Sequence, residues 1–192
     1  NVESIIIEPE SLVFHSKIPG SSNFGHVVRC MFGKDQMAVK FLQFSSQNII
    51  ESFKSEWKLI SHMKHENLLS LRGIVSGGSQ LGIAMEHMHT SLHNILSEHT
   101  LSHDQSIHFA RQVASALTYL HEKNIVHGNL NPLNILLDET YSIVKLSDVG
   151  LLKTRSLVEE QRECGFRSLR YVSIEKMKGE SLTTHSDVYT FG

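Results

Sequence analysis

Residues 127–137 read HGNLNPLNILL, a polar loop that runs directly into an apolar piece. Asparagine, glycine and proline dominate the first part of this stretch, and these residues favour turns over helices or sheets. The following NILL, and SIVKLSD at 142–148, have the apolar content of short buried strands. We therefore predict two short strands flanked by polar loops.

Helices are predicted on the N-terminal side of this loop, a short one over Leu92–Glu98 and a long one that begins at Ser102. Gln105 stands three residues after Ser102 and completes a capping box. Asn124 is expected to end the long helix in a left-handed conformation. The apolar spacing predicts a buried stripe formed by Ile107, Ala110, Val113, Ala114, Leu117 and Leu120.

The first part of the chain has a different pattern. Residues 12–42 alternate apolar and polar positions, with breaks at 19–20 and 33–35, which predicts a three-strand meander. A helix is predicted over Asn48–Met63, and two further strands over Leu68–Val75 and Gln80–Glu86, with a turn at 77–78. A small, mostly antiparallel sheet with one helix results, and the fold class is α+β.

The helix predicted at 48–63 carries a carboxylate beside its apolar face. Glu56 lies at the edge of that face, whereas Glu51 points nearly the opposite way. Glu56 is thus held against whatever the helix packs on. The apolar face is predicted to consist of Ile49, Ile50, Phe53, Trp57 and Ile60.

Composition excludes several classes of protein. Of 192 residues, 40% are hydrophobic and 20% charged, which is ordinary for one globular domain with two lobes. A net charge of -2 with scattered basic residues favours neither nucleic acid nor an acidic membrane as a partner. Cys30 and Cys164 are far apart and lack metal spacing, and no apolar run is long enough to span a membrane. These features predict an intracellular, cytoplasmic domain.

Histidines are numerous, 13 in all, but they lack the spacing of a zinc site. His87, His89 and His93 form only a loose group. Scattered histidines are therefore favoured over a metal site.

Nine short motifs occur in one order across the chain. They are GSSNFGHV at 20–27, MAVK at 37–40, a helix with an inward glutamate, HENLLSLRG at 65–73, MEHM at 85–88, HGNLNPLNILL, KLSDVG at 145–150, SIE at 173–175 and SDVYTFG at 186–192. In this order they resemble a eukaryotic protein kinase domain of the tyrosine-kinase or tyrosine-kinase-like branch. The resemblance implies a bilobal fold, with an N-terminal lobe at 1–88 and a C-terminal lobe at 89–192. The last motif opens that lobe's central helix, so an incomplete lobe and a fragment are expected.

The resemblance implies an ATP site in the first lobe. Gly20, Ser22 and Gly25 match the glycine-rich hairpin over the phosphates, although a serine replaces its middle glycine. Lys40 matches the lysine that holds the α- and β-phosphates, and Glu56 matches its partner on the helix.

The same resemblance implies the residues around the adenine ring and the metal. Met85 would guard the back of the pocket and the hinge would run from Glu86 to Met88. Val27, Ala38 and Leu136 would sandwich the ring, although each apolar residue would equally suit ordinary core. Asn134 and Asp148 match the two positions that hold Mg²⁺.

The catalytic loop departs most from the family pattern. Where the family has H-R-D-L-K-P, this chain has HGNLNP, so Gly128, Asn129 and Asn131 replace arginine, the catalytic aspartate and lysine. A carboxamide does not take a proton from a hydroxyl group at neutral pH, but it orients one by hydrogen bonding. Loss of a general base typically costs about 10²- to 10⁴-fold in rate. Efficient phosphoryl transfer is therefore not expected.

The activation segment, residues 148–175, is expected to be a loop. Thr154, Ser156, Ser168 and Tyr171 are possible phosphate acceptors, but each is more simply interpreted as a solvated hydroxyl. Gly128 removes the arginine that would receive such a phosphate. The segment ends at Glu175, which in the family pairs with a distant arginine.

These features predict a pseudokinase that binds ATP and regulates or scaffolds a protein partner, such as an active kinase or a substrate protein. The alternative is a weakly active kinase that transfers the ATP γ-phosphate to a Ser, Thr or Tyr hydroxyl, with Asn129 orienting that hydroxyl. A nonfunctional gene remnant is a third possibility.

Overall fold

The computed structural model of the protein describes residues 6–18, 25–42, 46–77, 80–160 and 169–192. The chain divides into two compact units. The first consists of Asn1–His62, Ser70–His87 and Lys153–Cys164, and the second of Met63–Leu69, Met88–Leu152 and Gly165–Gly192.

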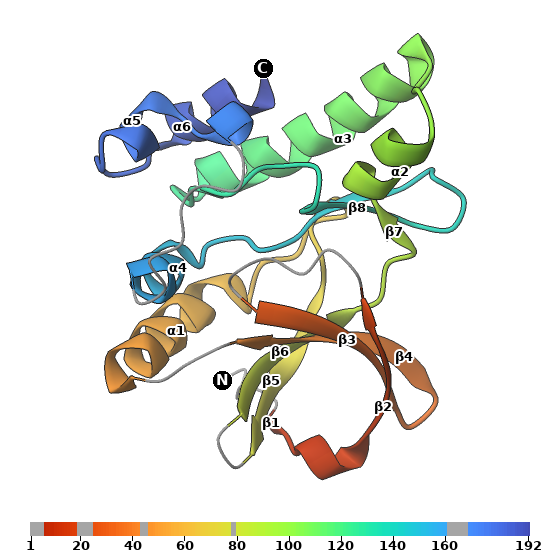
Figure 1. Ribbon diagram of the computed structural model, residues 1–192, viewed down its shortest axis with the longest axis vertical. Coiled ribbons are helices and arrows are strands. Elements are labelled where there is room, and N and C mark those ends of the chain that lie inside the picture. Colours follow the sequence, from red (N-terminus) through yellow and green to blue (C-terminus); the bar gives the residue numbers. More distant parts are fainter. Residues whose placement is uncertain (1–5, 19–24, 43–45, 78–79, 161–168) are drawn as a thin grey trace. The chain divides into compact units, whose positions relative to one another are not determined.

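The described part of the first unit contains a six-stranded sheet in the order β1-β5-β6-β4-β3-β2 (Figure 1). Neighbouring strands are antiparallel, except that β1 runs parallel to β5. The strands are β1 Ile6–Ile7, β2 Leu12–Ile18, β3 Gly25–Phe32, β4 Asp35–Leu42, β5 Leu71–Gly77 and β6 Gln80–Glu86.

The predicted meander is confirmed by β2, β3 and β4, and β6 has the predicted bounds. The strand predicted at Leu68–Val75 is displaced, because β5 begins only at Leu71. The residues before it hydrogen-bond elsewhere: Leu69 N–H donates to Leu146 O, and Leu146 N–H donates to Asn67 O. Strand β1 and the 3₁₀ turn η1, Pro9–Ser11, were not predicted.

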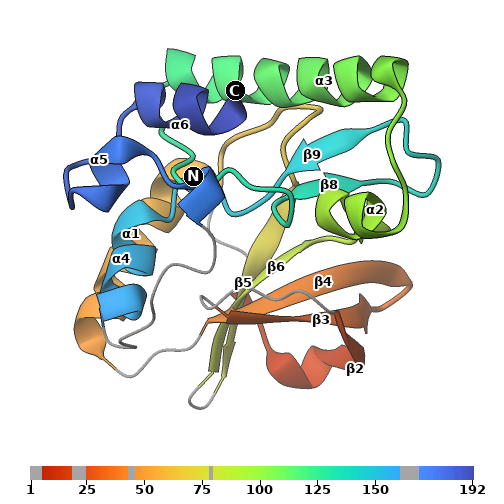
Figure 2. The same cartoon turned by 45° about the horizontal axis from the view of Figure 1, so that its top comes forward.

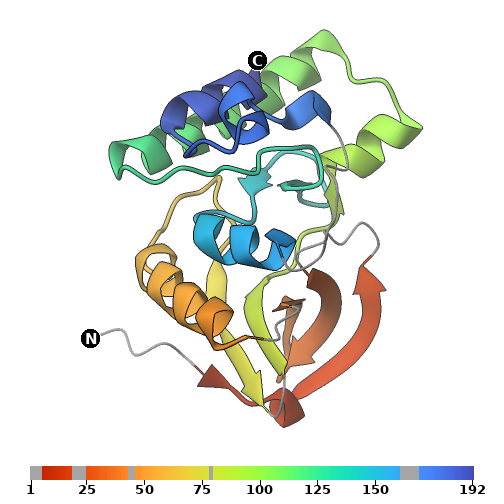
Figure 3. The same ribbon diagram turned by 60° about the vertical axis from the view of Figure 1, so that its left-hand side comes forward.

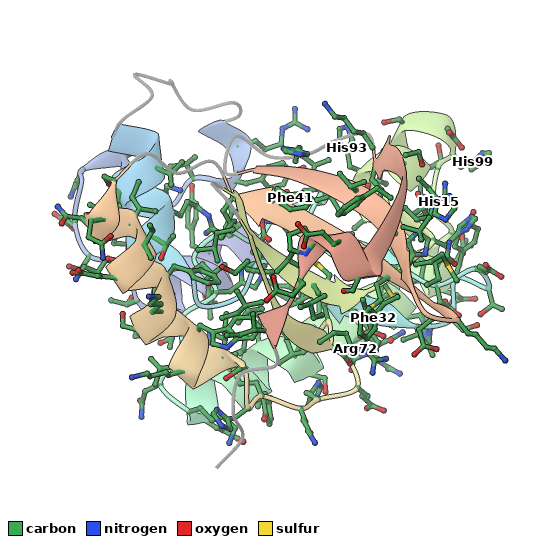
Figure 4. All side chains as sticks on the ribbon, turned by 90° about the horizontal axis from the view of Figure 1, so that it is seen from below. His15, Phe32, Phe41, Arg72, His93 and His99 are labelled. Carbon is green, nitrogen blue, oxygen red and sulfur yellow. The ribbon has the colours of Figure 1, made fainter. Side chains whose placement is uncertain are left out.

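One face of this sheet buries an apolar cluster. At its edge Phe41 contacts the rings of Phe14 and His26, with centroid distances of 5.7 and 5.4 Å. Figure 4 labels Phe41 among the strands. The cluster, which holds this face of the sheet together, consists of Ile7, Leu12, Cys30, Met37, Val39, Phe41, Val75 and Ala84.

Helices α1, Gln47–Ile60, and α4, Leu152–Glu160, lie side by side (Figure 3). The helix predicted to reach Met63 ends at Ile60, where Ser61 N–H still donates to Trp57 O. Its buried residues are Ile49, Ser52, Phe53, Trp57 and Ile60, so the predicted face is confirmed except for Ile50, which is half-buried. Helix α4 replaces the loop that we expected there.

The described part of the second unit has a three-stranded sheet, β7-β8-β9, with α2 and α3 between β7 and β8 in the chain and α5 and α6 after β9 (Figure 2). The strands are β7 Thr90–Ser91, β8 Ile135–Leu137 and β9 Val144–Leu146. The helices are α2 Leu92–Glu98, α3 His103–Glu122, the 3₁₀ turn η2 Leu169–Tyr171, α5 Ile174–Met177 and α6 Thr184–Phe191. The strands predicted at NILL and SIVKLSD are confirmed, as is α2.

Helix α3 begins and ends as the sequence predicts. Ser102 Oγ accepts from Gln105 N–H, and Gln105 Oε1 accepts from Ser102 N–H, at 3.2 and 2.9 Å. Asn124 has a φ of 55° and Ile125 N–H donates back to Leu120 O, which closes the C-terminus.

The buried stripe of α3 is partly different from the prediction. Ile107 and Ala110 are exposed and Ala114 is half-buried. The apolar spacing predicted the helix correctly but included exposed residues on one side of the buried stripe. Spacing alone does not determine which apolar residues face the core. The buried residues are Phe109, Val113, Ala116, Leu117 and Leu120.

No helix in the described ranges is long and apolar enough to cross a membrane.

The capping box of α3 gives a first test of the fold. Ser102→Ala removes the hydroxyl that accepts from Gln105 N–H and should lower the free energy of unfolding by about 1 kcal/mol. Thr118 on the same helix is a matched control, because its hydroxyl only donates back to Ala114 O. Thr118→Ala should stay within about 0.5 kcal/mol of the parent. Urea unfolding measures both, and equal losses would contradict the capping role.

Candidate nucleotide site and catalytic loop

Four residues predicted for the ATP site share one face of the sheet in the first unit. Directly opposite residues of antiparallel strands point to the same face. Val27 lies opposite Lys40, and Ala38 lies opposite Met85. Because Ala38 and Lys40 are two residues apart on β4, all four side chains point the same way. Lys40 is buried, with 4% of its surface exposed.

Gly25 begins β3 at a position where only glycine fits. A Cβ on this residue would overlap the carbonyl oxygen of Phe41 on the neighbouring strand. The pairing of β3 with β4 therefore requires a glycine at position 25, as the predicted hairpin does. Gly20 and Ser22, the other two predicted hairpin positions, lie outside the described residues.

The predicted hinge residues fall in different surroundings. The carboxylate of Glu86 accepts from Ser70 N–H at 2.5 Å, while Glu86 N–H donates to Ser70 O at 3.0 Å. Met88 and Leu136 belong to the second unit, Leu136 on β8 opposite Ser91. The hinge and adenine roles of these residues stay predictions.

Glu56 lies half-buried on α1, and its carboxylate faces the start of α4. Oε1 accepts from Lys153 N–H at 2.7 Å. Oε2 accepts from Thr154 N–H at 3.0 Å and from the Thr154 hydroxyl at 2.5 Å. The predicted pairing of Glu56 with Lys40 stays a prediction.

In the second unit, the catalytic loop is anchored by Asp187 on α6. Its two carboxylate oxygens accept from His127 N–H and Gly128 N–H, both at 2.8 Å. His121 Nε2 donates to the same carboxylate at 2.9 Å. Asp187 is only 1% exposed, and a buried carboxylate is tolerated when donors satisfy it in this way.

Gly128 occupies a position that excludes a side chain. Its φ is 67°, in the left-handed region that glycine adopts without strain. A Cβ here would overlap Leu152 Cδ2 and lie 3.1 Å from Leu182 Cδ1. The absent arginine is therefore more than a lost charge, because leucine side chains fill the space where it would begin.

The backbone carbonyl of Asn129, rather than its side chain, is the shared hydrogen-bond acceptor of the loop. Asn129 O accepts from Asn131 Nδ2 at 2.8 Å and from Asn134 Nδ2 at 2.7 Å. Asn131 Oδ1 also accepts from Leu133 N–H at 2.9 Å. The side chain that replaces a lysine is thus turned back into its own loop.

Asn134 and Asp148 lie at the same end of the β8–β9 pair. Asn134 immediately precedes β8, Asp148 follows β9 by two residues, and Ile135 lies opposite Leu146. Ser147 N–H donates to Asn134 O at 2.9 Å, which joins the two segments. Because Asn134 Nδ2 donates within the loop, its Oδ1 and the Asp148 carboxylate are the oxygen donors that suit Mg²⁺.

The activation segment differs from the expected loop. Thr154 is fully buried on α4, so the solvated hydroxyl predicted there is wrong. Ser156 is exposed but helical, Tyr171 is half-buried, and Ser168 lies outside the described residues. The pKa of the Glu175 carboxyl lies below its usual value, first because its own backbone N–H donates to it and then because the Ser173 hydroxyl does.

Among the described residues, no group of three or more His, Cys, Asp or Glu side chains could hold a metal ion.

Sequence reasoning missed the role of Asp187 and the helix α4. Asp187 gives no local signal, since its partners stand about sixty positions earlier. Helix α4 did give one: Leu151, Thr154, Arg155 and Val158 are all buried and follow helical spacing. The polar residues between them hid this pattern.

The fold, with its sheets and helices in this order along the chain, is that of a protein kinase domain. The protein tyrosine and serine/threonine kinase family matches residues 12–192, and the chain belongs to this family. The α+β fold predicted from the sequence, with a sheet and helix in one unit and a mainly helical second unit, is that of a kinase domain.

Known relatives include kinases of different specificity. A mitogen-activated protein kinase kinase kinase 7-like protein of Drosophila melanogaster is 32% identical over 92% of this chain and 46% of its own length. A G-type lectin S-receptor-like serine/threonine-protein kinase of Oryza sativa subsp. indica is 35% identical over 81% of the chain and 20% of its length. A tyrosine-protein kinase of Caenorhabditis elegans is 28% identical over 90% and 33%. The chain thus spans less than half the length of these relatives.

The space over Gly128 can be tested with a matched glycine. Gly128→Leu and Gly179→Leu both place a side chain on a left-handed residue, at a cost of about 1–2 kcal/mol. A Cβ on Gly179 meets nothing within 4 Å, whereas one on Gly128 meets Leu152. Gly128→Leu should therefore cost about 1–3 kcal/mol more.

Urea unfolding measures the difference between the two leucine variants. Adding Leu152→Ala to Gly128→Leu should restore most of the extra unfolding free energy that this variant loses. Adding it to Gly179→Leu should restore none. Equal losses at both glycines would show that Leu152 does not fill the position.

Proposed function

We propose that this kinase domain binds Mg-ATP but is catalytically impaired, and that it acts in signalling as a regulator or scaffold of a protein partner. The observation that carries the proposal is the catalytic loop. Asn129 stands in place of the family's catalytic aspartate, while Asn134, which would supply an oxygen donor to Mg²⁺, is held in the loop by its Nδ2, 2.7 Å from Asn129 O.

The loop lacks two groups that a phosphotransferase uses. Without an acid at Asn129, the general base is absent, and that contribution is typically about 10²- to 10⁴-fold in rate. Asn131 is neutral and is held by Asn129 O and Leu133 N–H, so it supplies no positive charge to the γ-phosphate. Together these losses oppose efficient turnover.

The nucleotide-binding groups support the other half of the proposal. Val27, Ala38, Lys40 and Met85 form one face of the sheet, where the ammonium of Lys40 would hold phosphates and the apolar residues would contact the adenine ring. Asn134 and Asp148 would hold Mg²⁺, which when bound neutralises phosphate charge. Gly20, Ser22, Gly25, Glu86, Met88 and Leu136 would complete the site.

The proposal also includes the branch of the family, the bounds of the two lobes and the location of the domain. We place the domain in the tyrosine-kinase or tyrosine-kinase-like branch, with lobes at 1–88 and 89–192. A cytoplasmic location fits a regulator of another kinase or of a substrate protein. A second candidate function is weak phosphoryl transfer, favoured by Asn129, whose carboxamide can orient a hydroxyl group without taking its proton.

Nucleotide binding is tested by thermal unfolding with Mg-ATP. A ligand that binds only the folded state stabilises it in proportion to the logarithm of its concentration, by about 2.7 kcal/mol at a hundredfold excess over Kd. The melting temperature should rise with millimolar Mg-ATP in the parent and in Lys34→Ala, an exposed turn lysine. It should not rise in Lys40→Ala. The absence of any rise in the parent would leave only scaffolding.

Phosphoryl transfer is tested with radiolabelled ATP. The parent should transfer no more label than Lys40→Ala, and Asn129→Asp should transfer more because it restores a proton acceptor. Label above the Lys40→Ala background in the parent would overturn the impaired assignment and support the weakly active kinase.

A further inference from the structure

Asn134 is held in the second unit through its N–H, its Nδ2 and its carbonyl oxygen. The N–H donates to Asn131 O at 3.0 Å and Nδ2 donates to Asn129 O at 2.7 Å. The carbonyl oxygen accepts from Ser147. The residue is 5% exposed, and its hydrogen bonds to the described parts of the chain do not use Oδ1. This oxygen is therefore the atom through which Asn134 can bind a ligand.

Ser147 holds the carbonyl of Asn134 twice. Its N–H donates to Asn134 O at 2.9 Å, and its hydroxyl donates to the same oxygen at 3.2 Å. Ser147 is buried, with 8% of its surface exposed. Every residue except proline offers the N–H, whereas the second bond requires a side chain that can donate. The hydroxyl is thus a specific contribution of serine at this position.

The two bonds lie at the end of the β8–β9 pairing. Ile135 lies opposite Leu146, so Asn134 and Ser147 form the next pair along. Directly after Ser147, Asp148 has a φ of 62°, which a residue other than glycine adopts only where its surroundings hold it. The chain therefore leaves the sheet at Asp148, and Ser147 is the last residue that fixes where it leaves.

We propose that Ser147 is a positioning residue for Mg²⁺. Its hydroxyl fixes the spacing of Asn134 and Asp148, because it bonds the carbonyl of the first immediately before the chain reaches the second. This inference rests on the proposed function, in which these two residues hold Mg²⁺. Ser147 acts through them and does not touch the metal.

The chemistry of Mg²⁺ explains why such a bond matters. The ion requires oxygen ligands at about 2.0–2.1 Å in a nearly ideal octahedron, so it tolerates little error in their positions. Residues that hold metal ligands in place are important for the same reason, and their loss typically costs about 10- to 100-fold in metal affinity. Removal of the Ser147 hydroxyl leaves its N–H on Asn134 O, so we expect the lower value, about tenfold.

The test compares ATP binding with and without the metal in the full-length protein. The Kd for ATP is measured in EDTA and in excess MgCl₂, and the ratio of the first constant to the second reports the contribution of Mg²⁺. Ser147→Ala should lower this ratio by about tenfold and leave the Kd in EDTA unchanged. Ser147→Thr keeps a hydroxyl on a residue that suits a strand end, and should keep the ratio of the parent.

Ser91 provides a matched control in the same sheet. It is also buried, with 9% of its surface exposed, and its hydroxyl accepts from Asn94 N–H at the start of α2. Ser91→Ala should lower the midpoint of urea unfolding, because a helix cap is lost, without changing the ratio. Equal falls of the ratio in Ser91→Ala and Ser147→Ala would show a general loss of stability and overturn the positioning role.

A second variant decides the question if Ser147→Ala does not fold. Ser147→Cys fills nearly the same space, and its thiol is a weaker donor than a hydroxyl. It should lower the ratio by about threefold, the order of one weakened hydrogen bond. Circular dichroism before each titration shows which variants are folded.

The parent protein separates failure of this inference from failure of the proposed function. If Mg²⁺ strengthens ATP binding in the parent and equally in folded Ser147→Ala, the inference is wrong and the proposed function stands. If the parent binds ATP equally in both buffers, the metal role of Asn134 and Asp148 and the inference are both wrong. If it binds ATP in neither buffer, the proposed nucleotide function fails and the inference fails with it.

Discussion

The catalytic loop depends on the buried carboxylate of Asp187. Its oxygens receive the N–H groups of His127 and Gly128, so the backbone at the start of the loop has one orientation. The left-handed Gly128 fits that orientation without strain. The direction in which the chain enters the loop is therefore set by an aspartate about sixty positions later in the sequence.

The sequence was sufficient where structure depends on neighbouring residues. The capping box of Ser102 and Gln105 and the left-handed Asn124 were both predicted, because their hydrogen bonds lie within a few positions. The strand meander and the polar ends of β8 and β9 were predicted for the same reason. Asn134 and Asp148 lie at the same end of the β8–β9 pair, and their role in holding Mg²⁺, which the resemblance implies, stays a prediction.

The sequence did not predict the features that depend on contacts between residues far apart in the chain. Strand β5 starts late because Asn67 and Leu69 hydrogen-bond Leu146 instead of continuing the strand. Glu56 was recognised as an inward carboxylate, yet its acceptance of two backbone N–H groups requires α4 to be folded and adjacent. Such contacts gain energy only after the chain has been brought together, so local patterns do not encode them.

The replacement of charges by carboxamides in the catalytic loop has a structural consequence of its own. A lysine at position 131 has only donors, whereas Asn131 donates to Asn129 O and accepts from Leu133 N–H at once. The same carbonyl also receives Asn134 Nδ2, which fixes the direction of Asn134 Oδ1. Asn131 and Asn134 are thus held by the same carbonyl oxygen, that of Asn129. In the proposed function, metal binding and proton acceptance are separable because they would depend on different side chains of this short segment, Asn134 and the residue at position 129.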